Sequence, residues 1–128
     1  MSEADYMLVS APLTEETRGL IGKKEFDSAK PGAIFINLGR GPVVQEEALC
    51  DALESGLLGG AALDVFCQEP LSPQSRLWDL DNVLISPHNM DQTATFMHEA
   101  TEFFVFENLA RFVRNEPLLN HVDKVAGY

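Results

Sequence analysis

The stretch Gly32–Val44, GAIFINLGRGPVV, decides the fold that we expect for this chain. Its first half is a short apolar run without alternating polar residues, which is typical of a strand buried on both faces of a parallel sheet. Its second half turns at Gly39-Arg40-Gly41, where the glycines let the backbone bend tightly beside a charged side chain. The pattern predicts a buried strand that delivers an arginine to the carboxyl edge of a sheet.

Three further apolar runs repeat this pattern, and we expect strands at Tyr6–Ser10, Ala61–Phe66 and Val83–Ser86 besides Ala33–Asn37. The segment Gln45–Ser55 between them has one apolar stripe and an acidic first turn, which is typical of a helix. Right-handed crossovers then predict an α/β fold. It is a partial Rossmann-type parallel sheet of about four strands with flanking helices on both faces.

The connecting segments are shorter and less regular. Thr14–Ile21 is expected to form a short helix, and Lys23–Lys30 another short turn. Gln68–Asp81 contains two prolines and is predicted to be an irregular loop. Gly56 is placed to end the helix before it, because glycine adopts the left-handed conformation common after a helix.

A long C-terminal helix is expected from Thr93 to about Arg114. Its apolar residues fall on two faces: Met97, Ala100, Phe104 and Leu109 on one, and Phe96, Phe103 and Phe106 on the other. A surface helix needs only one apolar face. We therefore expect something besides the sheet to cover this helix, with a solvated second face as the alternative.

Composition limits the function classes. The chain has 128 residues, 45% of them hydrophobic, which is enough for one domain with an apolar core. Its formal net charge of −11 argues against nucleic acid and anionic membranes as partners. No apolar run approaches the ~20 residues that span a bilayer, and no secretory signal is readable. The two cysteines, Cys50 and Cys67, form no disulfide framework. We expect a cytoplasmic protein without a metal site.

A cation, two carboxylates and an imidazole lie at or just beyond the ends of the predicted strands: Arg40, Asp64, Glu69 and His88. Ligands of parallel α/β sheets bind outside the carboxyl ends of the strands. A guanidinium matches a carboxylate bidentately, and an imidazole exchanges a proton near neutral pH. The set predicts an acid–base site with an anion clamp, suited to oxidising or reducing a hydroxy acid. The alternatives are a surface arginine, a loop carboxylate and a packed loop histidine.

Four segments carry a family resemblance: PLTEETRGLIG, KPGAIFINLGRGPVVQEEAL, GGAALDVFCQEPL and SPH. Together, over Asp5–His88, they resemble the C-terminal half of the nucleotide-binding domain of the D-isomer-specific 2-hydroxyacid dehydrogenases. The resemblance implies NAD or NADP as cofactor. It implies that Arg40 clamps the substrate carboxylate, that His88 is the general acid/base and that Glu69 is its partner. The residues implied at the cofactor are Pro12 beside the adenine, Asp64 at the nicotinamide carboxamide, Gly39 and His88.

The resemblance is partial. No G-x-G-x-x-G fingerprint is present, so residues 1–128 are interpreted as the C-terminal half of a dinucleotide-binding domain, without the upstream fingerprint and substrate domain. The chain alone is expected to be inactive. Met90-Asp91 stands where many relatives have small residues, which favours an unusual substrate or subfamily.

Within the family, the favoured substrates are glyoxylate or hydroxypyruvate, as small 2-hydroxy or 2-oxo acids, and the parent enzyme is expected to be a homodimer. The competing hypothesis is a non-catalytic interaction module, similar to relatives that act as transcriptional corepressors. The presence of Arg40, Glu69 and His88 together argues for the dehydrogenase, because an interaction scaffold does not need this set.

Overall fold

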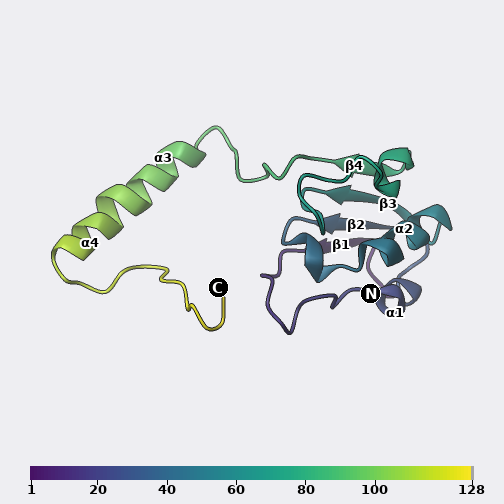
Figure 1. The fold of residues 1–128 in the computed structure, drawn as a ribbon, viewed down its shortest axis with the longest axis horizontal. Helices are drawn as coiled ribbons and strands as arrows, with labels where there is room; N and C mark the ends of the chain where they lie inside the picture. The colour runs from purple at the N-terminus through teal and green to yellow at the C-terminus, as the bar shows by residue number, and fades with distance from the viewer. Residues whose placement is uncertain (128) are drawn as a thin grey trace. The chain divides into compact units, whose positions relative to one another are not determined.

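A computed structural model describes residues 1–127, and the chain divides into two compact units. The first unit, Met1–His88, holds a four-stranded sheet with its helices, and the second, beginning at Asn89, holds the C-terminal helix (Figure 1). The candidate site residues named above all belong to the first unit, so this unit is the one that positions the site.

The sheet has four parallel strands in the order β1-β2-β3-β4. Their bounds are β1 Tyr6–Val9, β2 Ala33–Asn37, β3 Leu58–Leu63 and β4 Val83–Ile85. The predicted four-stranded parallel sheet is confirmed, and β2 has the predicted bounds.

The predicted third strand is misplaced, because β3 begins at Leu58 and ends at Leu63 rather than running to Phe66. Its first residues include glycines, which are poor strand formers by propensity. Here they are needed, since a Cβ on Gly59 would lie 2.5 Å from the carbonyl oxygen of Gly32 in the adjacent chain segment. The earlier start and earlier end place Asp64 just beyond the strand.

The two helices between the strands are α1, Lys23–Asp27, and α2, Glu46–Glu54. They pack against each other and therefore lie on the same face of the sheet (Figure 1). Strands that follow one another in one direction through right-handed crossovers put their helices on one face. The expectation of helices on both faces is not met in this unit, where Tyr6 and Leu8 of β1 are exposed.

The helix expected over Thr14–Ile21 is absent, and this segment forms turns. The Thr14 amide donates to Thr17 Oγ1 at 2.8 Å, and the Thr17 amide donates to Thr14 Oγ1 at 3.2 Å. Threonine side chains that bond nearby backbone groups compete with the helix in this way. The stop predicted at Gly56 is confirmed by its φ of +73°. The predicted loop Gln68–Asp81 contains a 3₁₀ helix, η2, at Arg76–Asp79.

The core lies between the sheet and its two helices. The rings of Phe26 and Phe35 meet edge to face with centroids 5.3 Å apart, and both are almost fully buried. From α2, Leu49, Cys50 and Leu53 complete this core. Burial raises the pKa of the Cys50 thiol to about 11, so this cysteine is a packing residue that stays protonated.

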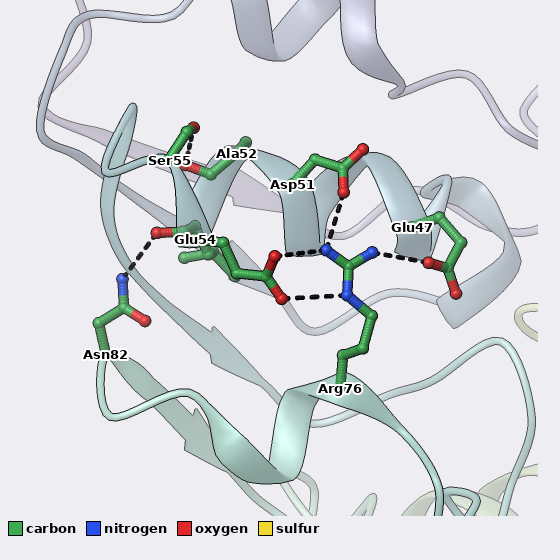
Figure 2. A network of polar contacts seen from close by, with 8 residues as sticks. Glu47, Asp51, Ala52, Glu54, Ser55, Arg76 and Asn82 are labelled. Carbon is green, nitrogen blue, oxygen red and sulfur yellow. Dashed lines mark hydrogen bonds and ion pairs between the residues drawn. The ribbon is translucent and has the colours of Figure 1, made fainter.

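Arg76 ties η2 to α2, as Figure 2 shows. Its Nη1 donates to Glu47 Oε2 at 2.8 Å, and its Nη2 donates to Asp51 Oδ1 at 2.8 Å and to Glu54 Oε2 at 2.6 Å. The three carboxylates follow one another on one face of α2, three or four residues apart. Hydrogen bonds to Glu54, Asp51 and Glu47 raise the pKa of the Arg76 guanidinium. The contact fixes the loop between β3 and β4 against the helix layer.

The second unit contains α3, Phe96–Ala100, a π-helical segment η3, Thr101–Leu109, and α4, Ala110–Val113, which follow one another as one helix (Figure 1). The helix expected from Thr93 begins later, at Phe96. Its two predicted apolar faces assume 3.6 residues per turn, whereas the hydrogen bonds of a π-helix join residues five apart. The two predicted apolar faces therefore do not apply to the residues of η3. No helix within residues 1–127 has the length and apolar content needed to cross a membrane.

We expect Phe35→Ala to lower the free energy of unfolding of the first unit by about 3–5 kcal/mol, because it leaves a cavity where Phe26 loses its ring partner. Tyr6→Ala is the matched control, since this strand aromatic is 71% exposed, and it should cost less than about 1 kcal/mol. Urea unfolding followed by circular dichroism measures both. Equal losses would contradict the assigned core.

The Arg76 contacts make stability depend on pH. The hydrogen bond from Arg76 lowers the pKa of Glu54 in the folded chain. A lowered carboxyl pKa stabilises the folded state above the ordinary glutamate pKa, and this stabilisation is lost as pH falls through the lowered value. We expect Arg76→Gln to reduce stability at neutral pH and to flatten the acid side of the stability curve. Arg18→Gln, an exposed arginine outside this network, is the control, and an unchanged curve in Arg76→Gln would refute the assignment.

Candidate active site

The buried side chain of Asn37 holds the turn after β2. Its Oδ1 accepts a hydrogen bond from the Gly39 amide at 3.1 Å, and its Nδ2 donates to the Arg40 carbonyl at 3.4 Å. The Arg40 side chain is exposed, and its Nη1 donates to the Gly39 carbonyl at 2.8 Å. The Asn37 side chain thus braces this turn, and the turn presents a cation beyond the carboxyl end of β2.

Gly39 lies against the segment that follows β1. A Cβ at this position would lie 2.8 Å from the Ala11 carbonyl oxygen, so the approach requires glycine. Pro12, the next residue of that segment, is exposed, and Thr17 Oγ1 donates to its carbonyl at 2.7 Å. Thr17 thus braces this segment. The structure thus places Pro12 and Gly39 at the same edge, and their contact with a cofactor stays a prediction.

His88 and Glu69 form the shortest contact between the predicted catalytic residues, with Nδ1 and Oε2 2.7 Å apart. The other oxygen, Oε1, accepts a hydrogen bond from the Phe66 amide at 2.9 Å. Burial acts to raise the pKa of Glu69, but the hydrogen bonds from His88 and the Phe66 amide and the charges of His88 and Arg40 outweigh it, so this pKa is lowered. Glu69 therefore stays a carboxylate beside the imidazole.

The backbone of His88 has a φ of +54°, the left-handed region that is unfavourable for residues other than glycine. Such a conformation costs roughly 1–2 kcal/mol and persists where surrounding contacts hold it. The bond to Glu69 is such a contact. The preceding Pro87 restricts Ser86 to an extended conformation, which ends β4 and directs the chain into this turn.

Asp64 follows β3 and is 3% exposed. Its Oδ1 accepts a hydrogen bond from Ser86 Oγ at 2.6 Å, so the ends of β3 and β4 are joined by their side chains. A buried carboxylate at this edge offers the acceptor that a carboxamide N–H requires. The sequence singled out Asp64 but not Ser86, whose position directly before Pro87 was the available signal.

A cavity of about 540 Å³ lies beside the Glu69–His88 pair. Most of its lining is apolar and includes Phe66, Leu71 and Trp78. The Trp78 Nε1–H donates to the Ser72 carbonyl at 2.9 Å, which fixes the indole at the cavity. Leu71 and Trp78 were not predicted to line a cavity, because their segment was predicted to be an irregular loop without η2.

The structure brings together most of the predicted set. Glu69 and His88 are in contact, and Arg40 is near enough for its charge to lower the pKa of Glu69. Asp64 pairs with Ser86. Cys67 is a poor nucleophile, since burial and the neighbouring Glu46 raise the pKa of its thiol. Among residues 1–127, no three His, Cys, Asp or Glu side chains gather where they would hold a metal ion.

A parallel sheet with its polar residues gathered at the carboxyl edge defines the class as a Rossmann-type nucleotide-binding domain. Residues 1–89 match the sequence model of the family described as D-isomer specific 2-hydroxyacid dehydrogenase, NAD binding domain. The match covers well over half of the chain. This chain belongs to the D-isomer specific 2-hydroxyacid dehydrogenase family.

Two curated relatives give the scale of the similarity. An uncharacterised protein of Corynebacterium melassecola is 38% identical over 127 residues, which is 99% of this chain and 41% of the relative. Glyoxylate/hydroxypyruvate reductase B of an Enterobacter species is 54% identical over 88 residues, which is 69% of this chain and 27% of the relative. The chain thus spans less than half the length of these relatives.

Two solved structures resemble the fold. One is a D-isomer specific 2-hydroxyacid dehydrogenase from Xanthobacter autotrophicus in complex with NADPH and MES, with a TM-score of 0.86 and 42% identity. The alignment covers 99% of this chain and 51% of the dehydrogenase chain. The other is an NADPH-dependent glyoxylate/hydroxypyruvate reductase from Sinorhizobium meliloti in complex with NADP and sulfate, with a TM-score of 0.87 and 39% identity. The alignment covers 99% of this chain and 41% of the reductase chain.

We expect Asn37→Ala to destabilise the first unit by about 1–3 kcal/mol, because the buried Gly39 amide loses its acceptor. Asn82→Ala is the control, since the Asn82 Nδ2 bond to the Leu53 carbonyl is longer, at 3.4 Å, and its residue is only half-buried. Urea unfolding compares the two variants. An Asn37→Ala variant as stable as Asn82→Ala would show that the turn does not depend on this side chain.

Proposed function

We propose that residues 1–88 supply the acid–base pair and the carboxylate clamp of an NAD(P)-dependent 2-hydroxyacid dehydrogenase. In this proposal the chain is the C-terminal half of the dinucleotide-binding domain, and the whole enzyme reduces small 2-oxo acids such as glyoxylate or hydroxypyruvate. The observation that carries the proposal is the 2.7 Å contact between His88 Nδ1 and Glu69 Oε2. A histidine that only packs in a loop does not require a carboxylate partner, whereas His88 contacts Glu69, which the Phe66 amide holds in place.

The substrate is bound through its carboxylate by Arg40, whose exposed guanidinium offers a planar pair of donors. Because Nδ1 of His88 faces Glu69, Nε2 is the ring atom that exchanges a proton with the substrate oxygen. In reduction, Nε2 donates its proton to the carbonyl oxygen, and in oxidation it accepts the hydroxyl proton. The ionised Glu69 stabilises the imidazolium that donates.

The described residues fit the nicotinamide end of the cofactor. Asp64 is a buried acceptor at the carboxyl edge, and the buried Gly39 and the exposed Pro12 lie at the same edge. A bound NADH or NADPH supplies the hydride for reduction. The two solved relatives named above hold NADPH or NADP, which supports NADP as the cofactor. A homodimeric parent and a cytoplasmic location stay predictions.

A chimera tests the proposal. The segment of the Enterobacter reductase that matches this chain over 88 residues is replaced by residues 1–88, and glyoxylate reduction is followed with NADPH. We expect turnover. His88→Ala should lower kcat by about 10²–10⁴-fold, the usual contribution of general acid–base catalysis. Arg40→Ala should instead raise KM, since a hydrogen bond to a charged group contributes about 1.5–3 kcal/mol, or roughly 10- to 150-fold in affinity.

Arg18→Ala is the matched control for Arg40→Ala, because Arg18 is also an exposed arginine and is assigned no part in binding or catalysis. It should leave kcat and KM unchanged. A chimera whose His88→Ala variant keeps a near-normal kcat would refute the acid–base assignment. Turnover that is lost in the chimera while NADPH binding persists would favour the non-catalytic module instead.

A further inference from the structure

The turn that carries Arg40 is in close contact with the segment after β3. A Cβ on Gly41 would lie 1.9 Å from both the carbonyl carbon and the oxygen of Phe66, and 2.5 Å from the Cys67 nitrogen. These are backbone atoms, which cannot rotate away as the end of a flexible side chain can. Gly41 is buried, so the two segments touch backbone to backbone.

Gly41 touches the peptide group between Phe66 and Cys67, and Phe66 holds Glu69 through its own amide, on the other side of its Cα. The Phe66 amide donates to Glu69 Oε1 at 2.9 Å, and Glu69 Oε2 lies 2.7 Å from His88 Nδ1. The position of Phe66 therefore sets the position of the carboxylate, and the carboxylate orients the imidazole. Gly41 stands at the start of this series of contacts.

We propose that Gly41 is a positioning residue for the Glu69–His88 pair. Its lack of a side chain lets the Arg40 turn support the Phe66 carbonyl, and this support fixes Phe66 so that its amide stays bonded to Glu69. The same contact sets the spacing between the carboxylate clamp and the acid–base pair. The role of this spacing in catalysis rests on the proposed function, whereas the contact itself does not.

Gly39 provides a matched comparison two residues away. A Cβ there would meet the Ala11 carbonyl oxygen at 2.8 Å, so Gly39→Ala displaces the segment after β1. Gly41→Ala displaces the segment that bears Phe66. Both substitutions add one methyl group to the same turn, and they differ in which neighbour must move.

The test measures the Glu69 carboxyl pKa by carbon-13 NMR in the full 128-residue chain, in Gly41→Ala and in Gly39→Ala. In the unaltered chain this pKa is lowered in part by the Phe66 amide. We expect Gly41→Ala to raise it toward the ordinary glutamate value, and Gly39→Ala to leave it in place. The ring-shifted resonances of the Phe26–Phe35 pair report that each variant is folded. A folded Gly41→Ala with an unmoved Glu69 pKa, or an equal rise in Gly39→Ala, would overturn the proposal.

A second measurement needs no substitution at Gly41, which matters if that variant does not fold. In the unaltered chain, the amide resonances of Phe66 and Gly41 should shift with pH at the Glu69 pKa, while that of Gly39 should not. Glu69→Gln should abolish both shifts. A Gly41 amide resonance that does not shift with pH at the Glu69 pKa would overturn the proposal. Neither readout uses turnover, so an inactive chimera would refute the proposed function and leave this result unchanged.

Discussion

The site depends on the parallel pairing of four strands that end in the same row. Val9, Asn37, Leu63 and Ile85 face one another across the sheet. Beyond this row the backbone continues to pair, since the Leu38 amide donates to Val9, the Asp64 amide to Asn37 and the Ser86 amide to Leu63 at 2.9–3.1 Å. The proposed site residues follow this shared end along the chain. The register therefore fixes where the site can form.

The chemistry at this edge comes from one carboxylate that contacts two neighbours. Glu69 accepts from the Phe66 amide with one oxygen and contacts His88 with the other. These bonds and the charges of His88 and Arg40 lower its pKa despite partial burial. The carboxylate stays ionised until the pH falls through this lowered value. At neutral pH the imidazole thus faces a carboxylate that accepts a hydrogen bond at Nδ1 and orients the ring.

Much of this could be predicted from the sequence. The run Ala33–Asn37 is unbroken and apolar, so its bounds were correct, and Arg40, Glu69 and His88 carry motif context that placed them at strand ends. Segments with competing interactions were predicted less well. Thr14–Ile21 has the composition of a helix start, but its threonines bond the local backbone instead.

Other features depend on contacts between segments that are distant in the sequence, and the spacing of apolar residues along the chain does not indicate such contacts. The start of β3 includes two glycines because neighbouring backbone comes close, at Gly32 for Gly59 and at Asn82 for Gly60. The loop that holds Trp78 is ordered by Arg76 and three carboxylates of α2, a contact that no local pattern indicates. The packing of Gly41 against Phe66 is of the same kind, since the two are far apart in sequence.

In the proposed site, Glu69 holds His88 with Nδ1 protonated and leaves Nε2 to exchange protons with the substrate. Nitrogen-15 NMR of the histidine ring tests it directly, because the shifts of Nδ1 and Nε2 report which atom carries the proton in the neutral imidazole. We expect a neutral His88 to carry its proton on Nδ1, and we expect Glu69→Gln to lose this preference. A neutral His88 that carries its proton on Nε2 would contradict it.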